Sequence, residues 1–142
     1  MKTVLFCVLA LLAGGAPAAD DARVLAPMPA AAADNLRSEM RASLLALNEI
    51  LALVAGGQLR EAAEVAEREL GRSAMGKHRS QPFEARPGPH MPPAMHAIGI
   101  DGHKAASDFA RVAAGGDREK TIASLPTLTT ACVACHHSYR LR

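Results

Sequence analysis

Aromatic residues are scarce in this chain of 142 residues, which contains three phenylalanines, one tyrosine and no tryptophan. Hydrophobic residues nevertheless make up 49% of the chain, so small aliphatic side chains must supply most of its apolar volume. Alanine is the commonest residue, whereas valine and isoleucine are sparse, and this mixture favours helices over strands. The length fits a single compact domain. We therefore expect an all-α domain, and the composition disfavours an all-β sandwich.

A strong excess of positive charge is also missing. The chain has 16 Lys and Arg residues against 14 Asp and Glu residues, a formal net charge of +2. Tracking nucleic-acid phosphates requires a broad cationic surface, so this balance disfavours nucleic-acid binding. No nucleophile is accompanied by a recognisable base, and no carboxylate pair is spaced for hydrolysis. We therefore expect a protein that is not an enzyme.

Long hydrophobic runs are absent as well. The apolar run from Val4 to Leu12 is far shorter than the roughly 20 apolar residues that a membrane helix requires. Lys2 precedes this run, and the small residues of the segment 16–19 follow it, which is the pattern of an export signal. The sequence therefore predicts that residues 1–19 are removed, and that the mature protein is periplasmic and has no stable membrane span.

Cysteine is rare, and the position of each cysteine is informative. Cys7 lies inside the predicted signal, so only Cys132 and Cys135 remain, too few for a four-cysteine zinc or iron–sulfur site. Together with His136 they form a CxxCH motif, the attachment signature of c-type haem. On a helix, residues i, i+3 and i+4 share one face, so two sulfurs and an imidazole can address one flat ligand.

The motif predicts one haem c, bound through thioethers to Cys132 and Cys135, with His136 as the proximal ligand of the iron. The alternatives are a disulfide, a thioredoxin-like redox pair or half of a metal site. An active redox pair normally lies at the N-terminus of a helix in a βαβ framework, whereas this pair lies near the C-terminus of a helical chain.

Apolar periodicity and glycine pairs predict four helices. The first starts at Asp34, which is available as its N-cap, and stops at Gly56-Gly57; the next two cover residues 58–70 and 94–114. The last helix starts either at the cap Asp117 or near Ser124, where Pro126 would fall in the first turn.

The segments between and before these helices are rich in residues that break helices. Residues 20–33 contain two prolines and predict a flexible or extended arm, and residues 71–93 form a long loop rich in Pro, Gly and His. Residues 34–142 then form an antiparallel four-helix bundle.

The segment from Cys132 to Arg140 reads CxxCHxxYR and resembles the ending of class II c-type cytochromes, the cytochrome c prime group and its low-spin, six-coordinate relatives. The resemblance implies an antiparallel four-helix bundle with haem attached near the C-terminus. It also implies that Tyr139 and Arg140 lie near the haem. The short second helix and the Pro-rich loop 71–93 depart from the family pattern, so the sequence leaves open whether the bundle forms a homodimer.

The second axial position of the iron distinguishes the possible functions. In the low-spin relatives a methionine of the first helix binds the iron, and Met40 has a similar placement on the apolar face of the predicted first helix. The resulting protein would carry one electron at a time between redox partner proteins. An open position would instead bind nitric oxide or carbon monoxide.

A third possibility is that a residue of the long loop or the next helix is the second axial ligand of the haem iron. The same residues could instead form a separate His/Met metal site. The candidates are His78, His90, His96, His103, Met75, Met91 and Met95.

Overall fold

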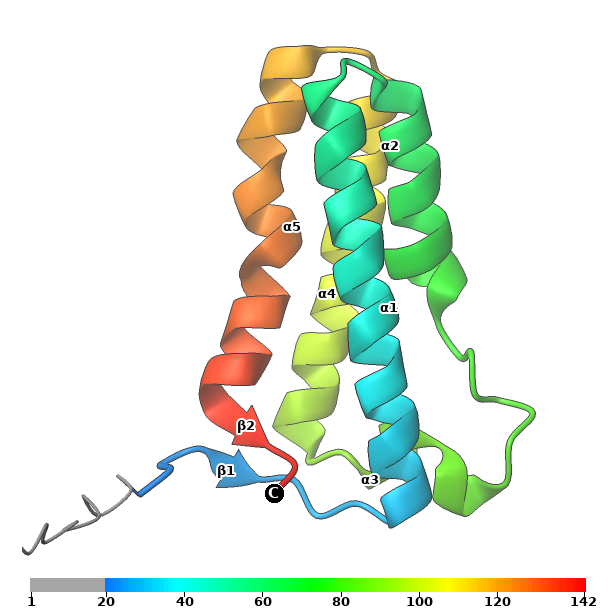
Figure 1. Cartoon of the computed structure of the whole chain (residues 1–142), viewed down its shortest axis with the longest axis vertical. Helices are drawn as coiled ribbons and strands as arrows, with labels where there is room; N and C mark the ends of the chain where they lie inside the picture. The colour runs from blue at the N-terminus through cyan, green and yellow to red at the C-terminus, as the bar shows by residue number, and fades with distance from the viewer. Residues whose placement is uncertain (1–19) are drawn as a thin grey trace, which may run out of the picture.

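The structure of the protein, a computed structural model, describes residues 20–142. The predicted export signal over residues 1–19 therefore lies outside the described residues. The described chain is mostly helical, which confirms the expectation of an all-α fold class. Its longest helices pack side by side as a helical bundle (Figure 1); they are α1 (Ala30–Ala55), α2 (Leu59–Val65), α4 (Pro93–Ala114) and α5 (Arg118–Ser138).

The remaining elements are short. One turn of π-helix, Ala66–Leu70, continues α2 and completes the helical segment predicted for residues 58–70. The connection to α4 holds two 3₁₀ turns, Arg72–Ala74 and Phe83–Ala85, and the single turn α3 (Pro87–His90). Two-residue strands β1 (Val24–Leu25) and β2 (Tyr139–Arg140) flank the bundle in sequence. Among the described helices, none combines the length and apolar character needed to cross a membrane.

Helix α1 begins earlier than its apolar periodicity predicts. Its N-cap is Pro29, and the amide of Ala33 donates to the carbonyl oxygen of Pro29 at 3.0 Å. Alanine has the highest helix propensity, and Ala32 and Ala33 are buried, so the run 30–33 joins the helix. The prediction that Asp34 is the N-cap is wrong: Asp34 instead forms an ion pair with Arg37, one turn later, at 2.7 Å.

The segment that precedes α1 belongs to the folded domain. Strand β1 pairs in parallel with β2, with Val24 opposite Tyr139. The amide of Ala26 donates to the carbonyl oxygen of Arg140 at 2.8 Å, and Ala26 is buried. Of the predicted flexible or extended arm over residues 20–33, the extended conformation is present at β1. Residues 24–26 are paired with residues 139–140, and residues 30–33 belong to α1, so the prediction of a flexible arm is wrong for these parts.

Helix α5 begins at the earlier of its two predicted starts. The side chain of Asp117 accepts a hydrogen bond from the amide of Lys120 at 3.0 Å, and this cap starts the helix at Arg118. Pro126 lies in the helix interior, so a start near Ser124 is wrong. The buried residues Thr121 and Leu128 anchor the helix on both sides of the proline, and this packing offsets the lost backbone donor.

The hydrophobic core has two parts. The larger part lies toward the Gly56-Gly57 and Gly115-Gly116 turns and includes the fully buried Ile50 and Phe109. The smaller part lies toward the other end of the bundle, and we call it the lower cluster; its members are Ala26, Leu36 and Met95, with Met28, Met91, Cys135, Tyr139 and Leu141 packed against them. The lower cluster therefore joins α1, α4 and the last turn of α5.

Candidate functional site

The CxxCH residues lie in the last two turns of α5. Cys132 and Cys135 are free thiols; Cys132 is exposed and Cys135 is half-buried against the lower cluster. The helix ends at Ser138, and the amide of Tyr139 donates to the carbonyl oxygen of Cys135. Since both cysteines and His136 are in regular helix, the spacing i, i+3, i+4 places them on one face, as the sequence predicts.

The two thiols of the motif differ in their surroundings, since Cys132 is exposed and Cys135 is half-buried. Burial, followed by the proximity of Cys132, raises the pKa of the Cys135 thiol above its ordinary value. Because the thiolate is the nucleophile, Cys135 itself is a poor attacking group for thiol–disulfide exchange.

Helix α1 brings Met40 to the same part of the bundle. Leu36 and Cys135 contact the same lower cluster, and α1 and α5 run in opposite directions (Figure 1). Met40 follows Leu36 by one helical turn and Cys132 precedes Cys135 by one turn, each about 5.4 Å along the axis. Met40 and Cys132 therefore lie at a similar height in the bundle.

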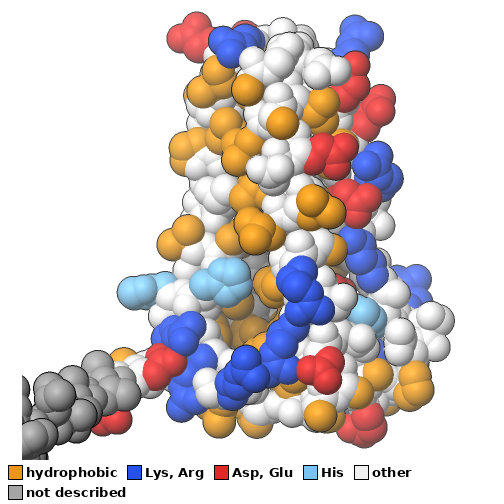
Figure 2. All heavy atoms as spheres, in the orientation of Figure 1, with side chains coloured by type: hydrophobic (Ala, Val, Ile, Leu, Met, Phe, Trp, Pro, Cys, Tyr) orange, Lys and Arg blue, Asp and Glu red, His pale blue; other side chains and the backbone are white. Residues whose placement is uncertain are grey.

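Apolar surface is left uncovered beside this site. On α1, Met40 is 39% exposed and Leu44, one turn further on the same face, is 68% exposed. Figure 2 shows the molecule, in the orientation of Figure 1, hollowed near its lower end, with hydrophobic side chains inside the hollow. Exposed side chains of this size at helical spacing form a surface that a flat apolar ligand would remove from water.

The residues present fit a haem. If a haem is bound, the two free thiols would supply the thioether bonds, the exposed imidazole of His136 would supply one axial ligand, and the thioether side chain of Met40 on α1 would supply a second. The agreement with haem binding therefore depends on these donor atoms and not on a preformed group of metal ligands. Among residues 20–142, no group of three or more His, Cys, Asp or Glu side chains is arranged to hold a metal ion.

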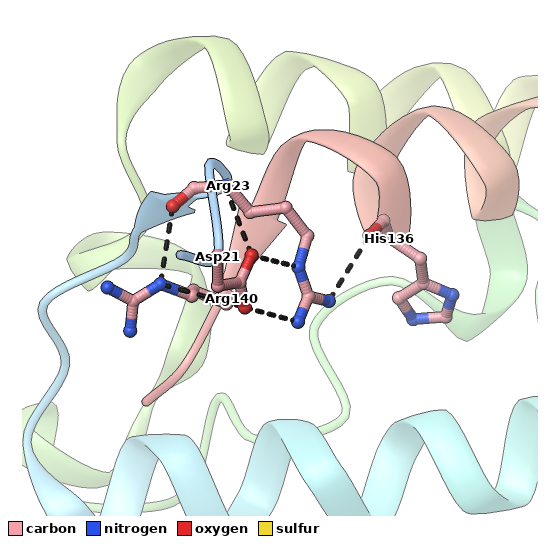
Figure 3. Close-up of polar contacts among 4 residues, drawn as sticks. All are labelled: Asp21, Arg23, His136 and Arg140. Carbon is pink, nitrogen blue, oxygen red and sulfur yellow. Dashed lines mark hydrogen bonds and ion pairs between the residues drawn. The ribbon is translucent and has the colours of Figure 1, made fainter. Parts of the chain in front are cut away.

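Two charged residues that sequence reasoning missed lie beside His136 (Figure 3). Arg23 donates through Nη1 to the carbonyl oxygen of His136 at 3.4 Å, and through Nη2 to Asp21 at 2.7 Å. Hydrogen bonds from the side chain and amide of Arg23 lower the pKa of Asp21 to about 2. No local pattern could have indicated this contact, because it joins opposite ends of the chain.

Tyr139 and Arg140, which the family resemblance places near the haem, lie in β2, directly after the end of α5 at Ser138. Tyr139 packs against the lower cluster, as Cys135 does. The Arg140 guanidinium lies 3.9 Å from the Asp21 carboxylate and donates to the carbonyl oxygen of Arg23 at 3.3 Å. The positive charge of Arg140 therefore lies close to the negative charge of Asp21.

The four candidate histidines of the loop and α4 lie in two places away from the CxxCH motif. His90 packs edge-on against Phe83, with ring centroids 5.0 Å apart. His78, His96 and His103 instead line a cavity of about 290 Å³ between the 71–93 connection, α1 and α4. None of the CxxCH residues lines this cavity. The three methionine candidates lie at the cavity, in the lower cluster or between them. Met95 is buried in the lower cluster, and Met75 is exposed at the cavity. Met91 lines the cavity and also packs against the lower cluster.

Comparison with known proteins finds no match to a protein-family model, to a curated protein or to a solved structure. The resemblance to class II c-type cytochromes consequently depends on the residues of the CxxCHxxYR segment.

Proposed function

We propose that this protein is a periplasmic mono-haem c-type cytochrome that carries one electron at a time between redox partner proteins. The single observation that supports this proposal best is the CxxCH face of α5, which carries two free thiols and an imidazole at a height in the bundle similar to that of the partly exposed Met40 of α1. The predicted export signal supports the location, because haem of this type is attached after translocation.

Each residue of the site has a defined role in the proposal. Cys132 and Cys135 hold the haem through thioether bonds, so that it cannot dissociate, and His136 and Met40 are the axial ligands of its iron. The haem supplies one-electron redox chemistry. A methionine ligand raises the reduction potential, and the surrounding apolar side chains of α1 limit access of water.

The helices around this site would form an antiparallel four-helix bundle in this proposal. Three-residue connections, each beginning with two glycines, join α1 to α2 and α4 to α5, and such short connections favour antiparallel neighbours. Tyr139 would pack beside the proximal side of the haem, since it already contacts the lower cluster with Cys135.

Visible spectroscopy of the exported, purified protein tests the function. A haem that resists extraction, together with a low-spin ferrous spectrum that carbon monoxide does not change, is the expected result. The double variant Cys132→Ala/Cys135→Ala is the control and should retain no covalently bound haem.

Two other outcomes of this spectroscopy would contradict the electron-carrier proposal. A high-spin ferrous form that binds carbon monoxide would replace the electron carrier by the second candidate, a five-coordinate protein that binds nitric oxide or carbon monoxide. Protein that matures without any thioether-bound haem would overturn both candidates.

A further inference from the structure

A cavity outside the CxxCH site carries an excess of positive charge. It has a volume of about 290 Å³ and lies between the 71–93 connection, α1 and α4. Its charged lining residues are Lys77, Arg79, Arg86 and a single acid, Glu39. The histidines His78, His96 and His103 complete its polar wall.

The acid and the lysine already have partners. The carboxylate of Glu39 lies 3.0 Å from His78 Nε2, and Lys77 lies 3.5 Å from Glu69 and donates to the carbonyl oxygen of Glu69. Arg79 and Arg86 differ from them, because within residues 20–142 neither guanidinium forms an ion pair with a carboxylate. Two arginine charges at this cavity are thus unbalanced.

The backbone of the loop holds the Arg86 guanidinium in place, and the exposed Arg79 side chain lies over the turn at Gly76. Arg86 donates through Nε to the carbonyl oxygen of Gln81 at 2.7 Å, and this bond leaves its terminal nitrogens available. Arg79 packs over Gly76, where an added Cβ would approach Arg79 Nη2 to 3.0 Å. Since Gly76 has a φ of 77°, the turn and the arginine position depend on glycine there. Donors fixed in advance lose less entropy when a ligand binds.

The histidines add polar groups without forming a metal site. His103 Nδ1 lies 2.8 Å from the carbonyl oxygen of Leu70, which only accepts, so Nδ1 carries the proton and the ring is fixed. His78 Nε2 is buried, and although it is close to Glu39 it lacks an aligned hydrogen-bond partner. Within residues 20–142, no three of the His, Cys, Asp and Glu side chains are grouped so that they could hold a metal ion. The two arginines that lack a carboxylate partner within residues 20–142, together with the buried Nε2 of His78, favour an anionic ligand over a cation.

We propose that this cavity binds a small anion that carries a carboxylate or a tetrahedral oxyanion group. Arg79 and Arg86 bind its oxygens through charge-assisted hydrogen bonds, for which the planar guanidinium is well suited. The cavity volume limits the ligand to a small molecule, since 300 Å³ is the lower end for ordinary ligand pockets. The cavity is built from the 71–93 connection, α1 and α4, without a CxxCH residue, so the proposal does not require the proposed haem function.

Isothermal titration calorimetry tests the proposal on the mature, reduced protein, with sulfate and succinate as probes in a chloride-poor buffer. We expect saturable binding of at least one probe. Loss of charge-assisted bonds in Arg79→Gln/Arg86→Gln should weaken that binding by about tenfold or more. The matched control is Arg118→Gln, which removes an exposed arginine near the Asp117 cap of α5 and should leave binding unchanged.

Three results would overturn the proposal. These are no binding of either probe, equal weakening by the control variant, and unchanged binding in the double variant. Thermal unfolding of each variant distinguishes loss of the site from loss of the fold.

Discussion

Arg23 and His136 are 113 residues apart in the sequence, yet Arg23 Nη1 donates to the carbonyl oxygen of His136 at 3.4 Å. The contact lies immediately after Cys135, where α5 approaches its end. The pairing of β1 with β2 continues the attachment along the next residues. The N-terminal segment therefore fixes the end of the helix that carries the CxxCH motif.

The first prediction concerns this attachment. Arg23→Gln removes the charged donor to Asp21 and His136, so the N-terminal segment should detach more often. Hydrogen exchange of the Ala26 amide, which donates to Arg140, should become faster. The midpoint of global thermal unfolding should change little, because the ion pair is exposed. Unchanged exchange at Ala26 would contradict the prediction, and Arg118→Gln is the control for removal of one surface charge.

The second prediction concerns pH. The pKa of Asp21 is about 2 in the folded protein because of hydrogen bonds from Arg23, against an ordinary value of 3.8. The unfolded or detached form therefore binds more protons between these values, and attachment is stabilised above them and weakened as pH falls through about 2. Protection of the Ala26 amide should be constant from pH 7 to 5 and decline in acid. In Asp21→Asn this acid-dependent decline should disappear; its persistence would assign it to another group.

A third prediction tests the proposed distal ligand. Met40→Ala should convert the low-spin haem spectrum to a high-spin one, since removal of the thioether leaves an open axial position. Met75→Ala is a suitable control, because Met75 has a similar exposure of 44% but lies at the anion cavity. A low-spin spectrum that survives in Met40→Ala would direct attention to a histidine ligand.

A fourth prediction compares two glycines of α4. A Cβ on Gly102 would lie 3.1 Å from the Cβ of Ala131 on α5, whereas a Cβ on Gly99 meets nothing within 4 Å. Gly99→Ala should stabilise the fold by about 0.5 to 1 kcal/mol, the usual gain for replacing glycine within a helix. Gly102→Val should destabilise it by about 1 to 3 kcal/mol through overpacking. Urea unfolding measures both, and equal effects would contradict close packing of α4 on α5.

Much of the helical structure could be predicted from local signals. The glycine pairs at 56–57 and 115–116 end their helices as expected, and α4 starts within one residue of its predicted position. Local signals did not identify the start of a helix where the sequence offered two nearby starting points. Asp34 resembles a cap but the alanine run before it extends α1, and Pro126 resembles a helix start although tertiary packing keeps it inside α5.

The candidate site was predictable to a different degree for each residue. Cys132, Cys135 and His136 could be grouped by spacing alone, because helical geometry fixes which side chains share a face. The positions of Tyr139 and Arg140 could not, because β pairing with residues 24–25 replaces the last helical turn. Asp21 and Arg23 left no local signal at all.

The sequence by itself determined the all-α class and the grouping of two thiols with one imidazole, because helix periodicity and capping act within a few residues. Only the tertiary structure decided that the N-terminal segment holds the end of α5, and that Arg79 and Arg86 meet three histidines at one cavity. These contacts join residues from separate elements, and their formation depends on how the helices pack, which no short sequence pattern encodes.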